Sequence, residues 1–131
     1  MSPNPATFAT LAVTVYAAHT LADHVVGQTD RQAALAAHVG AYHLILAAMC
    51  AAVVAVFGLP VSPTGAVAGL ALSAATHALW DRRTPVRWLL EHTGAVRFAA
   101  LADHGLNGMY LTDQALHTFC LWAAALAAVT L

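Results

Sequence analysis

Four long apolar segments, separated by polar or turn-forming stretches, organise this chain. A membrane-spanning helix needs about 20 predominantly apolar residues. Helix breakers and charges at Pro5, Gly58-Leu59-Pro60 and Asp81-Arg82-Arg83 bound the segments. The pattern therefore predicts an all-α fold: an integral membrane four-helix bundle formed by a single transmembrane domain, residues 1–131. The expected spans cover about 6–28, 33–57, 65–81 and 109–131.

The connection between the third and fourth spans, about 84–104, is long enough to hold structure of its own. Thr84 is the expected N-cap of a short interfacial helix, and Pro85 fits its first turn. This helix should end near Gly94. A second, weak helix is expected over Val96–His104.

Composition strengthens the membrane interpretation. The chain is 60% hydrophobic and 8% charged, whereas soluble domains carry about 25% charged residues. A soluble domain of 131 residues could not bury so much apolar surface. The formal net charge of −1 gives no basic face for nucleic acid, so the expected partner is the lipid bilayer. Cys50 and Cys120 both fall in apolar runs and are interpreted as small core residues.

Arginine predicts the orientation, because connections rich in basic residues face the cytoplasm. All five basic residues lie in the first and third connections, so both termini should face the extracytoplasmic side. These residues are Arg31, Arg82, Arg83, Arg87 and Arg97.

The third segment carries small residues at every fourth position: Gly65, Gly69 and Ser73. Such a stripe lets helices approach closely. It is expected to pack against a neighbouring helix of the bundle, and the alternative is the face of a homo-oligomer.

Histidine and aspartate four residues apart mark the ends of three segments, and residues at this spacing share one face of a helix. The alternating direction of the spans brings these pairs, and a histidine early in the second span, within roughly 10–15 Å of one membrane face. Ionisable groups inside a membrane are costly, so such a layer suggests a functional site. The candidate ligands are His19, Asp23, His38, His77, Asp81, Asp113 and His117.

Three interpretations fit this layer. Imidazoles and carboxylates bind zinc and other divalent transition metals. The leading hypothesis is therefore a metal-dependent hydrolase of a lipid-like or phosphoester substrate, with zinc as cofactor and Asp23, Asp81 and Asp113 as catalytic carboxylates. Alternatively the layer binds or transports a metal ion or a proton, or its hydrogen bonds only fix helix packing.

Further polar residues are expected to orient ligands rather than to bind the ion: Gln28, Tyr42 and Gln114. His43 lies off the helix face that carries His38, so it is left out of the site. No G-x-S-x-G, C-x-x-C, H-E-x-x-H or Walker motif occurs.

Taken together, these motifs resemble those of a family of small bacterial integral-membrane proteins, the domain-of-unknown-function family three-three-zero-seven. The pattern is H-x-x-x-D followed by Q-[TS] on the first helix, H-x-x-x-Y on the second, H-x-x-x-D on the third and D-Q-x-x-H on the fourth. The resemblance covers nearly the whole chain. It implies a multi-pass fold in the bacterial cytoplasmic (inner) membrane and this same site, but no particular reaction. A looser similarity is to bacterial membrane-bound metal-dependent hydrolases. The matching residues are His19, Asp23, Gln28, Thr29, His38, Tyr42, His77, Asp81, Asp113, Gln114 and His117.

Overall fold

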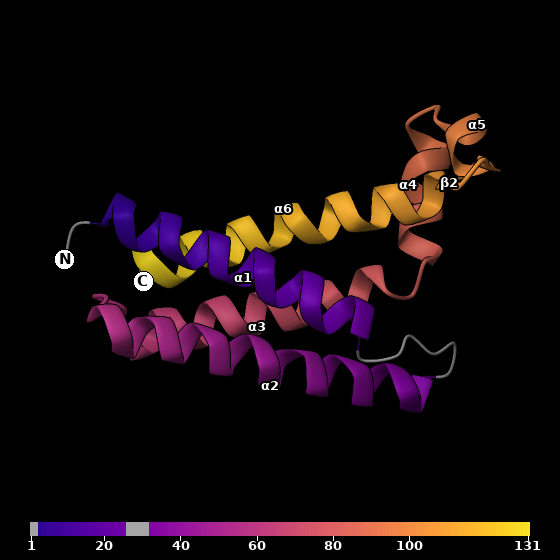
Figure 1. Ribbon diagram of the computed structural model, residues 1–131. Coiled ribbons are helices and arrows are strands. Elements are labelled where there is room, and N and C mark those ends of the chain that lie inside the picture. Colours follow the sequence, from indigo (N-terminus) through magenta and orange to yellow (C-terminus); the bar gives the residue numbers. More distant parts are fainter. Residues whose placement is uncertain (1–2, 26–31) are drawn as a thin grey trace.

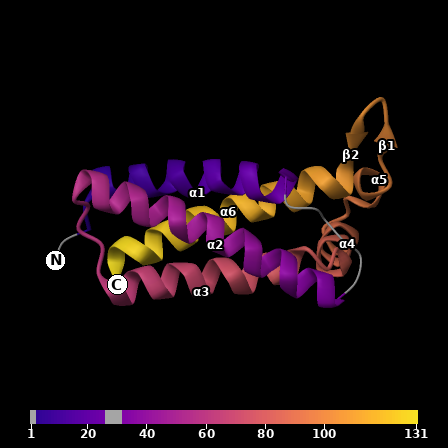
Figure 2. The ribbon, with the colours of Figure 1, turned by 60° about the horizontal axis from the view of Figure 1, so that its bottom comes forward.

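A computed structural model of the chain describes residues 3–25 and 32–131, with the side chains of 24, 25 and 32–34 excepted. Its four long helices lie side by side and alternate in direction (Figures 1 and 2). The prediction of an all-α fold is confirmed at this level. The four helices are α1 (Pro5–Val25), α2 (Gln32–Phe57), α3 (Pro63–Trp80) and α6 (Gly108–Thr130).

The start of α3 is fixed by local capping. The Ser62 side chain accepts a hydrogen bond from the Gly65 backbone nitrogen at 2.9 Å, and Pro63 occupies the first turn. The helix therefore begins two residues before the predicted start of the third span. It ends at Trp80, and Asp81 is its C-cap.

The connection between α3 and α6 is only partly as predicted. The short helix α4 (Thr84–His92) forms, but its N-cap is Arg83, with φ 58°, rather than Thr84. The second helix, α5, covers only Val96–Ala99. These elements lie at the end of the bundle opposite the two termini (Figure 1).

The prediction of a helix over the whole of Val96–His104 is wrong. Two short antiparallel strands, β1 (Ala102–Asp103) and β2 (Leu106–Asn107), occupy the end of that range and the residues after it. The two residues between them, His104 and Gly105, have φ 49° and 80°. Positive φ at both positions is what a tight two-residue hairpin loop requires.

Small residues bring α3 and α6 into close contact. A Cβ added to Gly69 would lie 2.8 Å from the carbonyl oxygen of Ala124, and one added to Gly65 would clash with the backbone of Ala128. The glycines of the stripe thus pack within the bundle, as expected. A homo-oligomer through Gly65, Gly69 and Ser73 stays only a prediction, because all three are buried inside the chain.

The outer faces of the bundle are apolar. Leu44 and Val56 on α2 are each 75% exposed, and Val13, Val67 and Phe119 are more than half exposed on the other three long helices. Within the described part of the chain, one helix is long and apolar enough to cross a membrane. Its apolar stretch runs from Leu35 to Phe57 with a mean hydropathy of 2.2.

Candidate metal centre

All four long helices contribute to one buried polar cluster. Since α1 and α3 end where α2 and α6 begin, the predicted His/Asp positions meet at the end of the bundle that carries α4 (Figure 1). The sequence predicted this convergence. The most deeply buried members, each no more than 6% exposed, are His19, Asp23, His38, His77 and His117.

Asp23, His38 and His77 form the first group of possible metal ligands. The His38 Nε2 lies 3.3 Å from the Asp23 Oδ1 and 3.3 Å from the His77 Nε2. One ligand atom from each residue falls within 4.8 Å of the others. Around a tetrahedral zinc with bonds of about 2.0–2.1 Å, neighbouring ligand atoms are about 3.3 Å apart. The observed separations from the His38 Nε2 therefore suit ligands of one ion.

A second group shares His77 with the first. The Asp81 carboxylate places Oδ2 3.2 Å from the His77 Nε2 and Oδ1 3.2 Å from the His117 Nε2. Its Oδ2 is also 3.7 Å from the His38 Nε2. Asp81 thus lies between histidines from three helices, and its side chain is only 13% exposed. Both groups use the His77 Nε2, whose single lone pair binds one ion, so together they describe a place for one ion.

The protonation state of His117 can be inferred from its partners. Its Nδ1 lies 2.9 Å from the backbone carbonyl oxygen of Asp113, which can only accept, so Nδ1 carries a proton. In a neutral imidazole the Nε2 is then an unprotonated acceptor. This Nε2 is buried and has no hydrogen-bond partner among the described residues, although the Asp81 Oδ1 lies 3.2 Å away. A neutral imidazole nitrogen and a carboxylate oxygen this close require a cation or a proton between them.

Asp23 is oriented by residues that are not themselves in either group. The Gln114 amide donates to the Asp23 Oδ2 at 3.0 Å, and its Oε1 lies 3.1 Å from the His19 Nε2. The His19 Nδ1 lies 3.1 Å from the Tyr42 hydroxyl. The Asp23 Oδ1 is buried and has no hydrogen bond among the described residues, which leaves it available to a metal.

The remaining predicted site residues are arranged as follows. Both ring nitrogens of His19 have hydrogen-bond partners, so a direct bond from His19 to a metal stays a prediction. Asp113 lies behind His117, with its Oδ1 3.6 Å from the His117 Nδ1 and no hydrogen-bond partner in the described part of the chain. Tyr42 and Gln114 lie beside the cluster and hydrogen-bond to its members, and their orienting role stays a prediction. Gln28 falls outside the described residues.

Among the described residues, the only basic side chains that lie close to the carboxylates of the cluster are histidines. Every short nitrogen–oxygen ion pair that Asp23, Asp81 and Asp113 make with described residues comes from an imidazole, and none comes from an arginine. Buried carboxylates need a partner charge or a bound metal. A divalent cation would supply the missing positive charge.

One polar pair next to the cluster was not predicted from the sequence. The His43 Nε2 lies 3.0 Å from the Ser73 Oγ, and the His43 Nδ1 lies 2.8 Å from the Val39 carbonyl oxygen. His43 was set aside because it lies off the His38 face. The sequence held one signal for this pair. Ser73 precedes His77 by one helical turn, so the two residues lie on the same face of α3.

Comparisons of the chain with protein-family models, with curated proteins and with solved structures found no match at all. The resemblance to the membrane-protein family named above stays a prediction, and the chemistry of the site rests on its geometry.

Proposed function

We propose that this protein is a multi-pass integral membrane protein that binds a divalent transition-metal ion in the His/Asp cluster. The observation that carries the proposal is the pair formed by the His117 Nε2 and the Asp81 Oδ1. These two atoms are 3.2 Å apart, and the proton on the other ring nitrogen of His117 points to the Asp113 carbonyl oxygen. A metal ion bound by both atoms accounts for this arrangement.

The surface and the helix lengths support a membrane location. The four long helices have 21, 26, 18 and 23 residues, hence about 27 to 39 Å at 1.5 Å per residue, against a hydrocarbon core of about 30 Å. No arginine or glutamate falls within their bounds. Their outward leucines, valines and phenylalanines are exposed, and soluble monomers rarely expose many large apolar side chains together.

The ligand set favours zinc, with manganese and iron as alternatives. Mixed imidazole and carboxylate ligands suit borderline divalent ions. The two thiols do not take part, because Cys50 and Cys120 belong to neither group of ligand atoms. Three protein ligands per group is also the number found in catalytic zinc sites, which keep one coordination position open.

We extend the proposal to hydrolysis of a lipid-like or phosphoester substrate. A bound ion of this kind would polarise the scissile group and lower the pKa of water. Of the three predicted catalytic carboxylates, only Asp113 belongs to neither ligand group, so it is the candidate proton acceptor. Its side chain is 16% exposed, although its Oδ1 is buried.

Metal binding is tested by elemental analysis of protein purified in detergent without chelators. We expect about one equivalent of zinc, manganese or iron, and a loss of most of it in His77→Ala, since His77 belongs to both groups. The matched control is His104→Ala, an exposed histidine outside the cluster. Absence of metal together with unchanged melting after chelation would overturn the proposal and leave a purely structural polar layer.

Hydrolysis is tested separately on metal-loaded protein with a chromogenic phosphodiester and a chromogenic acyl ester. Asp113→Asn should keep the metal and lose at least about a hundredfold in rate, the size of a general-base contribution. Asp103→Asn, which removes the same charge from the exposed hairpin, should have no effect. Metal-dependent ion flux into proteoliposomes without any hydrolysis would instead show a transport protein.

A further inference from the structure

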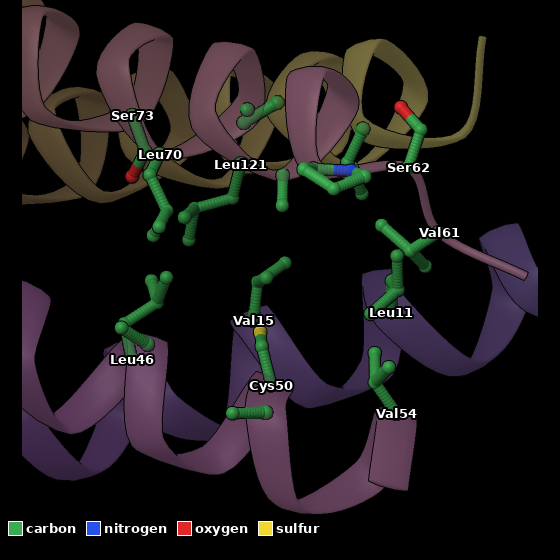
Figure 3. A pocket seen from close by; sticks show the side chains of 18 residues that line it. Leu11, Val15, Leu46, Cys50, Val54, Val61, Ser62, Leu70, Ser73 and Leu121 are labelled. Carbon is green, nitrogen blue, oxygen red and sulfur yellow. The ribbon is translucent and has the colours of Figure 1, made fainter. Parts of the chain in front are cut away.

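A partly open apolar cavity of about 390 Å³ is lined by residues of all four long helices (Figure 3). Apart from Ser62, Ser73 and Cys50, every residue that lines it is aliphatic, glycine or proline. Ser73 and Ser62 lie at its two opposite ends (Figure 3). Ser73 lies ten positions after Pro63 on α3, so at 1.5 Å per residue the cavity extends for about 15 Å.

The inner end of the cavity lies directly against the polar cluster. Val15, Leu46, Ser73 and Leu121 line the cavity. Each of them lies one helical turn from a residue in the cluster or from Tyr42, which contacts the cluster. The pairs are Val15 with His19, Leu46 with Tyr42, Ser73 with His77, and Leu121 with His117. The outer end includes exposed residues, among them Ser62 and Pro63, so the cavity reaches the surface there.

The shape and lining of this cavity suit a linear hydrocarbon chain. At about 30 Å³ for each water-sized group, the volume holds about a dozen carbon atoms, and an extended chain of that length matches the 15 Å depth. A cavity with apolar walls on four helices excludes charged and strongly hydrated ligands. Ligand pockets of this size typically hold one molecule with a few polar groups that fix its orientation.

The polar group at the inner end has defined hydrogen-bonding chemistry. The His43 Nδ1 must donate to the Val39 carbonyl oxygen, so in the neutral ring the His43 Nε2 is an acceptor. The Ser73 hydroxyl therefore donates its only proton to that Nε2. Helical threonines such as Thr14 and Thr76 donate instead to a carbonyl of their own helix. Ser73 is left with two lone pairs and can only accept from a ligand.

We propose that the cavity binds one unbranched alkyl chain of about a dozen carbons whose end group donates a hydrogen bond to the Ser73 Oγ. The end group is a hydroxyl or a protonated carboxyl, not an ether or an ester. The proposal does not depend on a bound metal, because none of the metal ligands lines the cavity.

The test is native mass spectrometry of the full chain released from a bile-salt detergent, which has no linear alkyl chain to compete. Dodecan-1-ol should bind with a stoichiometry of one, and its methyl ether should bind about three- to tenfold more weakly, the effect of one hydrogen bond. Dodecanoic acid, titrated in parallel below its pKa, distinguishes a fatty acid from an alcohol as the preferred ligand. Ser73→Ala should abolish the difference between alcohol and ether.

A matched pair of substitutions on α2 separates cavity binding from adsorption to the apolar surface. Ala51 lines the cavity and its neighbour Ala52 does not, while both are exposed. Ala51→Phe should reduce binding at least tenfold, and Ala52→Phe should bind like the wild type. Equal binding by these two variants, several bound alkyl chains, or equal affinity for alcohol and ether in the wild type would overturn the proposal. The Ala51/Ala52 comparison remains decisive if Ser73→Ala does not fold.

Discussion

The substitution Asp81→Asn distinguishes two interpretations of the cluster: a metal site, and a layer of hydrogen bonds that only fixes helix packing. Asparagine has the shape of aspartate but no charge, and its amide can donate. If the layer is purely structural, the new N–H would satisfy the His117 Nε2, and its oxygen would remain beside His77. The free energy of unfolding should then change by no more than about 1 kcal/mol.

The metal account predicts a much larger effect from the same substitution. Replacing a residue that only orients a ligand costs about 10–100-fold in metal affinity, so loss of the Asp81 carboxylate itself should cost at least about 100-fold. At a saturating metal concentration this corresponds to about 2.7 kcal/mol of lost stabilisation. For a chain of this size the melting temperature should fall by about 10 °C.

The assay is thermal unfolding in detergent at fixed free zinc, combined with competition against a chromophoric chelator. Asp103→Asn is the matched control, because Asp103 is exposed and pairs only with His104 among the described residues. The reasoning would be refuted if Asp81→Asn bound zinc as tightly as the wild type. It would also be refuted if zinc changed the melting temperature of neither the wild type nor Asp81→Asn.

Three further predictions follow from packing, from ligand orientation and from charge. Gly69→Ala should destabilise the protein by about 1–3 kcal/mol in thermal melts, because the new Cβ would lie 2.8 Å from the Ala124 carbonyl oxygen. Gly40→Ala, with nothing within 4 Å, should instead stabilise it by about 0.5–1 kcal/mol. Gln114→Leu should weaken zinc binding about 10–100-fold in the same chelator competition without unfolding the bundle, since Gln114 orients Asp23. A reporter enzyme fused after Leu131 should be active only if it is an extracytoplasmic type, because the arginines predict a cytoplasmic position for the opposite end of the bundle.

The bundle and the approximate place of the site could be predicted because both depend on spacing and direction. His77 and Asp81 share a helix face at any tertiary arrangement, and alternating helices bring such ends together. The hairpin after α5 could not be predicted in the same way. Its turn needs positive φ at His104, a residue type that gives no strong signal for that conformation.

The role of each polar atom could not be predicted from the sequence, because it depends on side-chain partners from other helices. His19 has the spacing of a metal ligand, but Tyr42 and Gln114 bind both of its nitrogens. His43 was set aside because of its position on α2, yet its contact with Ser73 on α3 brings it next to the cluster. Helical periodicity predicts on which face of its own helix a residue lies. It does not predict which residue of another helix that side chain contacts.

X-ray absorption spectroscopy of the zinc-loaded protein tests the central claim most directly, because it reports the atoms bound to the ion. The account predicts nitrogen and oxygen ligands at about 2.0–2.1 Å, with the outer-shell scattering of at least two imidazoles, and a loss of that scattering in His77→Ala. A sulfur ligand at about 2.3 Å, or an ion surrounded by oxygen without imidazole, would contradict it.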